Sequence, residues 1–176
     1  ELNAYNNDDP ETDTIEEILS DNLPTKILWF GARLRRYDDN EDIRIKSESA
    51  IRQQAPFMNQ IQAQNIQFIK VGYLRARELE PCKQCGNVQW KLTEKGVDVG
   101  LAVRMLVEAQ QPDVEIVIIS ADTDLIPAFK AVNKTDCHIV HVGYEYMPIA
   151  SLSQASNATR TITLPLVRKY LSSLSA

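Results

Sequence analysis

The 176 residues of this chain predict a three-layer α/β/α sandwich with a mainly parallel central sheet. Short apolar runs of strand length alternate with longer segments whose apolar residues recur at helical spacing. This alternation is typical of βαβ units with right-handed crossovers, in which helices cover both faces of a parallel sheet. Because a chain of this length with 44% hydrophobic residues can bury one substantial core, we expect a single domain over residues 1–176.

The individual elements follow from local patterns. A cap at Asp13 or Thr14 and an apolar stripe predict a short helix over residues 12–19. Strands are predicted near residues 26–34, 66–72, 115–119 and 138–142, with a short one at 161–164. Further helices are predicted near residues 43–65, 96–109 and 165–174, and Pro56 must either kink the first of these or begin a second helix. Turn residues at 81–87 separate two strand-like stretches, so residues 73–94 are expected to form a hairpin outside the main sheet.

The middle of the chain is more basic than the net charge of the whole chain indicates. The net charge is -5, but residues 26–104 carry 14 basic and 9 acidic residues. Aromatic residues Tyr37, Tyr73 and Trp90 lie among these bases, a combination that suits phosphates and unstacked bases of RNA. An ordinary solvated surface explains the same pattern. The candidate RNA-binding residues are Arg33, Arg35, Arg36, Arg75, Arg77 and Lys91.

Three aspartates lie where a parallel sheet binds its ligands. Asp122 and Asp124 directly follow the apolar run "EIVIIS", and Asp98 opens the preceding helix. Ligands of open parallel sheets bind outside the carboxyl ends of the strands. Each acid taken singly is equally well explained as a helix cap or as a partner of a helix dipole. Together, without histidine, they predict a hard oxygen site for Mg²⁺ or Mn²⁺, which would activate water and neutralise a leaving oxygen.

Two motifs in series resemble a known family. "EKGVDVGLAVRMLVEA" followed by "VEIVIISADTDLIPAFKAV" is similar to the NYN domain of the PIN-like ribonuclease superfamily, and the similarity extends from "KILWFGARLRR" to "ITLPLVRKYL". The resemblance implies a PIN-like fold and a metal-dependent endoribonuclease that hydrolyses single-stranded or looped RNA. It implies that Asp98, Asp122 and Asp124 bind metal and act in catalysis, and that Ser120 positions the loop or a phosphate.

The chain departs from this family's pattern at three places. A first strand ending in aspartate and asparagine is missing, and Asp8 and Asp9 are poor substitutes for it, so the domain is expected to lack that strand. Ala121 replaces a usual glycine, and Arg104 stands where many members have an acid. These differences bear on activity more than on fold.

The cysteines have a separate set of interpretations. Cys82 and Cys85 have zinc-knuckle spacing, but a closed zinc site needs four ligands. Cys137 and His141 would complete it only if the "CKQC" turn folds onto their strand, so zinc is not expected, although sharing between two chains is left open. A tight exposed turn is the favoured alternative. A thioredoxin-like redox role is weaker, because Gly86 and Asn87 interrupt the helix it requires.

The sequence also bears on alternative functions and on the cellular location of the protein. An Asp-x-Asp after a strand occurs in Mn²⁺-dependent glycosyltransferases, but the Asp98 motif would then be unexplained. A catalytically inactive NYN-like module that binds RNA or protein is the main alternative to a nuclease. The sequence has no membrane-length apolar run and too few cysteines for a disulfide framework, so we expect a soluble, cytoplasmic protein, with a homo-oligomer left open.

Overall fold

The computed structural model describes residues 26–173, which divide between Met105 and Leu106 into two compact units. Each unit contains its own three-stranded sheet. The predicted helix over residues 12–19, together with Asp8 and Asp9, lies outside the described residues. None of the helices within residues 26–173 has the length and hydrophobicity needed to span a lipid bilayer.

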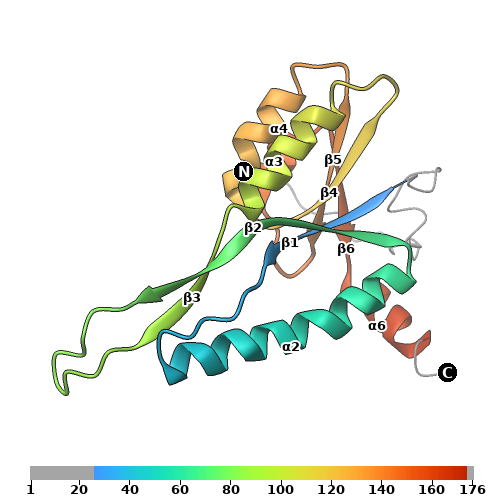
Figure 1. The fold of residues 1–176 in the computed structure, drawn as a ribbon. Helices are drawn as coiled ribbons and strands as arrows, with labels where there is room; N and C mark the ends of the chain where they lie inside the picture. Colours follow the sequence, from blue (N-terminus) through green and yellow to red (C-terminus); the bar gives the residue numbers. More distant parts are fainter. Residues whose placement is uncertain (1–25, 174–176) are drawn as a thin grey trace, which may run out of the picture. The chain divides into compact units, whose positions relative to one another are not determined.

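The first unit begins with a parallel crossover. Strand β1 (Ile27–Arg33), helix α2 (Glu41–Ala63) and strand β2 (Ile66–Glu78) follow one another, and β1 pairs parallel with β2 (Figure 1). Strand β3 (Trp90–Lys95) pairs antiparallel with the far half of β2, so the sheet order is β1-β2-β3. The strand predicted at residues 66–72 is therefore longer than expected, because it continues as one arm of a hairpin.

Helix α2 packs against β2 and β3. Its start is fixed by Asn40, whose Oδ1 accepts a hydrogen bond from the Ile43 backbone N–H at 3.0 Å. Ile43 and Ile61, near opposite ends of the helix, are buried. Pro56 lies inside this helix, which runs as a single element through residues 41–63.

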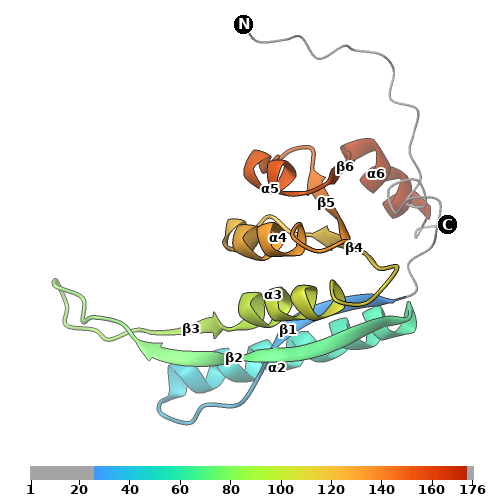
Figure 2. The same cartoon turned by 90° about the horizontal axis from the view of Figure 1, so that it is seen from above.

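Strand β2 changes its pairing at Gly72. This residue has a φ of +63°, and a Cβ there would lie 2.8 Å from the backbone nitrogen of Val97. Only glycine accommodates both the left-handed backbone and this close approach. Beyond it, β2 and β3 form a two-stranded ribbon whose tip, residues 79–89, extends past the start of α2 (Figures 1 and 2).

Helix α3 (Val97–Glu108) crosses the division between the units, and the second unit then alternates regularly. Its three strands are β4 (Glu115–Ile119), β5 (His138–Tyr144) and β6 (Ala158–Ile162). The helical elements are η1 (Thr123–Leu125), α4 (Ile126–Val132), α5 (Ala150–Ala155) and α6 (Leu164–Ser173). All strand pairs are parallel in the order β4-β5-β6, and α4 and α5 lie side by side on one face of this sheet (Figure 2).

The core of the second unit surrounds β5, which is buried almost throughout. Phe129 from α4 and Leu152 from α5 are fully buried, as are Ile139 and Val142 of β5. A central parallel strand is apolar on both faces, which explains why "HIVHVGY" lacks the alternation of a half-exposed strand.

The predicted α/β class, with helices and mainly parallel strands, is confirmed. The strand near residues 161–164 is displaced: β6 runs from Ala158 to Ile162, because its pairing with β5 begins at Ala158 opposite Val140. How many layers the whole chain forms stays a prediction, since the two units are described separately.

Candidate functional site

The acidic loop follows β4 directly, at the carboxyl end of the parallel strands. The Asp122 N–H donates to Ser120 Oγ at 3.1 Å, and Asp122 Oδ1 accepts a hydrogen bond from the Asp124 N–H at 2.9 Å. Asp122 is half-buried and caps the turn η1, whereas Asp124 is exposed. The capping role considered from sequence is therefore real, and it holds one carboxylate in a defined place.

His141 of β5 holds the start of this loop through a hydrogen bond. Its Nε2 lies 2.9 Å from the Ser120 carbonyl oxygen and its Nδ1 lies 3.3 Å from Ser153 Oγ. A carbonyl oxygen can only accept, so Nε2 donates to Ser120. The imidazole has 0% exposure and lies edge-on to Phe129, with ring centroids 6.2 Å apart. His141 thus anchors the residue from which the acidic loop departs.

The sequence interpretation missed this role, because it weighed His141 only as a zinc ligand. A signal was available. His141 is a polar residue within an otherwise apolar buried strand, and a buried polar side chain needs a hydrogen-bond partner.

Asp98 lies in the first turn of α3 and is exposed. The helix start is held by Glu94, whose Oε1 accepts the Val97 N–H at 2.8 Å. At Gly100 a Cβ would lie 2.8 Å from the Val71 Cβ, so this turn of α3 approaches β2 closely. Because Lys95 pairs with Tyr73, and Tyr73 with Arg33, α3 begins level with the carboxyl end of β1.

Each unit therefore brings its acid to the carboxyl end of a parallel strand, Asp98 beside β1 and Asp122 and Asp124 after β4. Their convergence on one metal stays a prediction, because Asp98 belongs to the first unit and the other two to the second. Among residues 26–173, no three His, Cys, Asp or Glu side chains are grouped as a metal site. The donor set itself, carboxylate oxygens without histidine or thiolate, fits Mg²⁺ or Mn²⁺ that retains water ligands.

The two faces of the hairpin of β2 and β3 carry side chains of different kinds. Residues paired across an antiparallel ladder share one face, and alternate residues point to opposite faces. One face, which we call the basic face, carries five exposed bases, one exposed tyrosine and a threonine: Arg33, Tyr73, Arg75, Arg77, Lys91, Thr93 and Lys95. The other face carries Leu74, Ala76, Glu78, Trp90, Leu92 and Glu94.

The basic face contains no acid, and Arg77 pairs directly with Lys91. Four of the six predicted RNA-binding residues lie on it. Lys95 was missed, although its spacing of two and four residues from Thr93 and Lys91 places it on the same side of a strand. Trp90, which the sequence interpretation grouped with the bases, lies on the opposite face.

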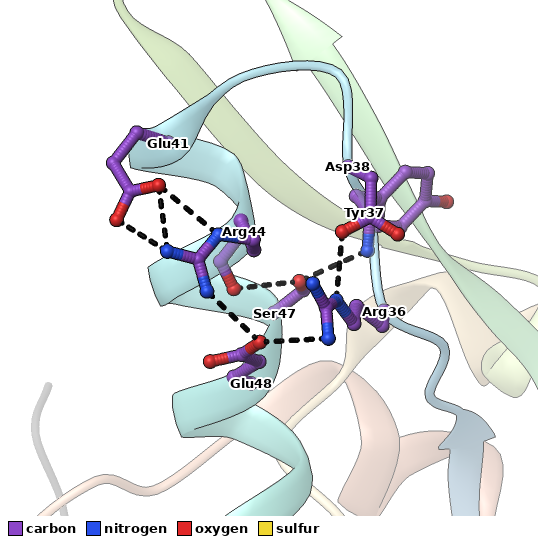
Figure 3. Close-up of polar contacts among 7 residues, drawn as sticks. All are labelled: Arg36, Tyr37, Asp38, Glu41, Arg44, Ser47 and Glu48. Atoms are coloured by element: carbon purple, nitrogen blue, oxygen red, sulfur yellow. Dashed lines mark hydrogen bonds and ion pairs between the residues drawn. The ribbon is translucent and has the colours of Figure 1, made fainter.

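The two remaining bases of the predicted set are engaged elsewhere. Arg36 donates from Nε to Asp38 Oδ1 at 2.7 Å and pairs through Nη1 with Glu48 at 3.4 Å (Figure 3). The guanidinium of Arg35 stacks over the Tyr37 ring at 4.5 Å. Arg36 is therefore compensated by acids, and we leave both residues outside the basic face.

This ion-pair network continues along α2. Glu48 also pairs with Arg44 at 3.3 Å, and Arg44 donates to Glu41, which holds the pKa of the Glu41 carboxyl below its usual value (Figure 3). Ser47 Oγ, behind the network, accepts the Tyr37 N–H at 3.1 Å and donates to the Arg44 carbonyl at 3.0 Å. These contacts fix the chain between β1 and α2.

The sequence profile of the NYN domain matches residues 30–164, and the chain belongs to the NYN domain family. NYN domains have a PIN-like, nuclease-type fold and generally act on RNA, and nucleases of this type generally use divalent metals.

Comparison with individual proteins adds little on function. A solved structure of a protein of unknown function from Vibrio parahaemolyticus RIMD 2210633 is similar, with 18% identity and a TM-score of 0.46. The match covers 62% of this chain and 60% of the Vibrio chain. Among curated proteins, none matches this chain.

Proposed function

We propose that this protein is a Mg²⁺- or Mn²⁺-dependent endoribonuclease that hydrolyses phosphodiester bonds of single-stranded or looped RNA in the cytoplasm. The observation that carries the proposal is the Asp122–Asp124 loop, which follows β4 directly in a chain of the NYN family. The basic face on the hairpin supports RNA as the substrate.

The acids have separate roles in this proposal. Asp98 and Asp122 would bind the metal, and Asp124 would bind a second ion or orient the attacking water. A bound ion would supply an acidified water and a counter-charge for the leaving oxygen. Hydrogen bonds within the chain fix the position of the acids. His141 donates to the Ser120 carbonyl, Ser120 Oγ accepts the Asp122 N–H, and Asp122 Oδ1 accepts the Asp124 N–H. Because these groups are positioned before the reaction begins, the site need not rearrange during it.

The basic face would bind the RNA strand. Like charges directly opposite in a sheet are unfavourable, yet Arg77 and Lys91 pair across the hairpin without an acid on that face. A phosphate lying between them would turn this repulsion into attraction. Tyr73, 54% exposed beside these bases, offers a ring on which a base can stack. The same face would serve a non-cleaving RNA-binding module, so cleavage itself must be tested.

The decisive variant is Asp122→Asn, because asparagine keeps the oxygen that caps η1 and removes the charge that a metal needs. Cleavage of an unstructured RNA in Mn²⁺ should fall at least about a hundredfold, since even the partners of metal ligands contribute 10- to 100-fold. Asp136→Asn, an exposed aspartate after α4, is the matched control and should cleave like the wild type. Wild-type protein that cleaves no RNA in Mn²⁺ would leave only the binding module, and normal cleavage by the Asp122→Asn variant would show that this carboxylate is not part of the site.

RNA binding is tested separately with catalytically inactive protein. A triple variant, Arg75→Ala with Arg77→Ala and Lys91→Ala, should bind single-stranded RNA more weakly. The slope of log affinity against log salt should fall by about 2, because about 0.7 counterions are released per phosphate contact on single strands. The control removes three exposed lysines of the second unit, Lys130, Lys134 and Lys169, for the same change in net charge. Equal slopes in the two triple variants would show that the basic face is only a solvated surface.

A further inference from the structure

The tip of the hairpin is a compact turn built around two cysteines. The Gly86 N–H donates to the Cys82 carbonyl at 2.8 Å, and the Cys82 N–H donates to the Asn87 carbonyl at 2.9 Å. Gly86 has a φ of +67°, which lets the backbone reverse directly after Cys85. One further bond, from the Leu79 N–H to the Gln89 carbonyl at 2.8 Å, closes the base of the tip.

Cys82 and Cys85, separated by two residues, both belong to this turn. The sulfur of Cys82 accepts hydrogen bonds from the backbone N–H groups of Gln84 and Cys85 and from the Cys85 thiol, and these donors lower the pKa of the Cys82 thiol. Both cysteines are exposed. The backbone hydrogen bonds of one turn thus hold two exposed cysteines two residues apart, an arrangement that can bind a soft cation through both sulfurs.

Within residues 26–173 the other thiol and both imidazoles have contacts of their own in the second unit. The 176 residues contain three cysteines and two histidines. Cys137 is buried, which raises the pKa of its thiol, and His141 uses both ring nitrogens inside the second unit. The remaining imidazole, His138, pairs with Glu115 at 3.0 Å. A second copy of the chain would supply two further ligands of the same kind.

We infer that the hairpin tip is half of a zinc site, and that two copies of this chain each contribute Cys82 and Cys85 to one tetrahedral Zn²⁺. The second copy is the partner because it supplies two identical ligands by two-fold symmetry, the commonest arrangement of homo-oligomers. The tip extends past the start of α2 within its unit, so it is accessible at the end of the hairpin (Figure 1). A Zn²⁺ with four thiolates carries a net negative charge, and Lys83, between the two cysteines of each copy, offsets it. Each thiol that binds releases its proton to solvent.

This site differs from the expectation drawn from sequence, which weighed chiefly whether one chain supplies all four ligands. It is independent of RNA cleavage, because neither cysteine belongs to the acidic loop or to the basic face. A structural zinc here would join two hairpins at their tips.

Zinc content and mass in solution test the proposal directly. Reduced protein loaded with Zn²⁺ and freed of excess metal should hold about one zinc per two chains and be a dimer by light scattering. Chelation should release monomers, and Zn²⁺ but not Mg²⁺ should restore the dimer. Co²⁺ in place of zinc should show the visible absorption of a tetrahedral tetrathiolate site. Cys82→Ser and Cys85→Ser should each lose zinc and dimer together, whereas the control Cys137→Ala should keep both.

Three results would overturn the inference. One is zinc bound at about one per chain in a monomer, which would mean that the other ligands are local. Another is undiminished zinc and dimer in Cys82→Ser. The third is reduced wild-type protein that takes up no zinc, which would leave the tip as a plain turn or a dithiol pair. Since both cysteines are exposed, circular dichroism should show that the serine variants fold normally, so a loss of zinc cannot be attributed to unfolding.

Discussion

Replacing Lys91 by glutamate should stabilise the free protein while weakening its binding to RNA. Lys91 pairs with Arg77 across the β2–β3 ladder, and both side chains are exposed. Opposite charges at such positions contribute roughly 0.2–1 kcal/mol, and like charges cost a similar amount. Solvent and salt screen exposed charges, so the expected gain in the free energy of unfolding is about 0.5–1 kcal/mol. For a chain of this size that corresponds to about 1–4 °C in melting temperature.

The same change should lower RNA affinity about threefold or more at moderate salt, because one phosphate contact is lost and a negative charge is added. Thermal unfolding and fluorescence anisotropy with a labelled single-stranded RNA measure the two effects. Lys134→Glu, with the same charge change at an exposed loop position of the second unit, should alter neither by a comparable amount. Our reasoning would be refuted if Lys91→Glu lowered the melting temperature, or if RNA binding were unaffected while stability rose.

Two further predictions concern buried and exposed polar groups. His141→Leu should lower the free energy of unfolding by about 2–4 kcal/mol, because it leaves the Ser120 carbonyl without its donor and Ser153 Oγ without its hydrogen-bond partner. His138→Leu on the same strand should cost less than about 1 kcal/mol, since its pair with Glu115 is exposed, and equal losses in urea unfolding would argue against the anchoring role of His141. In zinc-free reduced protein, alkylation followed by mass spectrometry should show Cys82 reacting at lower pH than Cys137, because N–H donors lower the pKa of Cys82 and burial raises that of Cys137. Thiolate forms as pH rises through the pKa, so coinciding pH profiles for the two cysteines would contradict this assignment.

Much of the candidate site was predictable because its signals are local. Asp122 and Asp124 come directly after an apolar run of strand length, and the structure places them in the loop after β4. Asp98 heads a segment with helical periodicity and lies in the first turn of α3. Strand and helix periods are set by a few consecutive residues, so the sequence suffices to locate these acids along the chain. Whether the three carboxylates meet remains a prediction, since that depends on the arrangement of the two units.

Other features depend on partners that are distant in sequence. The register of β3 against β2 decides that Arg75, Arg77 and Lys91 share a face and that Trp90 does not, and this register is set by hydrogen bonds across the hairpin. Arg36, one of the predicted RNA-binding residues, is outside the basic face because it forms an ion pair with Glu48 of α2. No local pattern specifies these pairings.

By itself, the sequence determined the α/β class, the order of its elements, the family motifs and the positions of the acids after their strands. The tertiary structure decided which bases act as one surface, that His141 supports the acidic loop, and that one hydrogen-bonded turn holds the two exposed cysteines. The physical reason is the range of the interactions. Periodicity and capping arise between neighbouring residues, whereas a shared face, a buried hydrogen bond and the direction of an N–H donor exist only after the chain has folded.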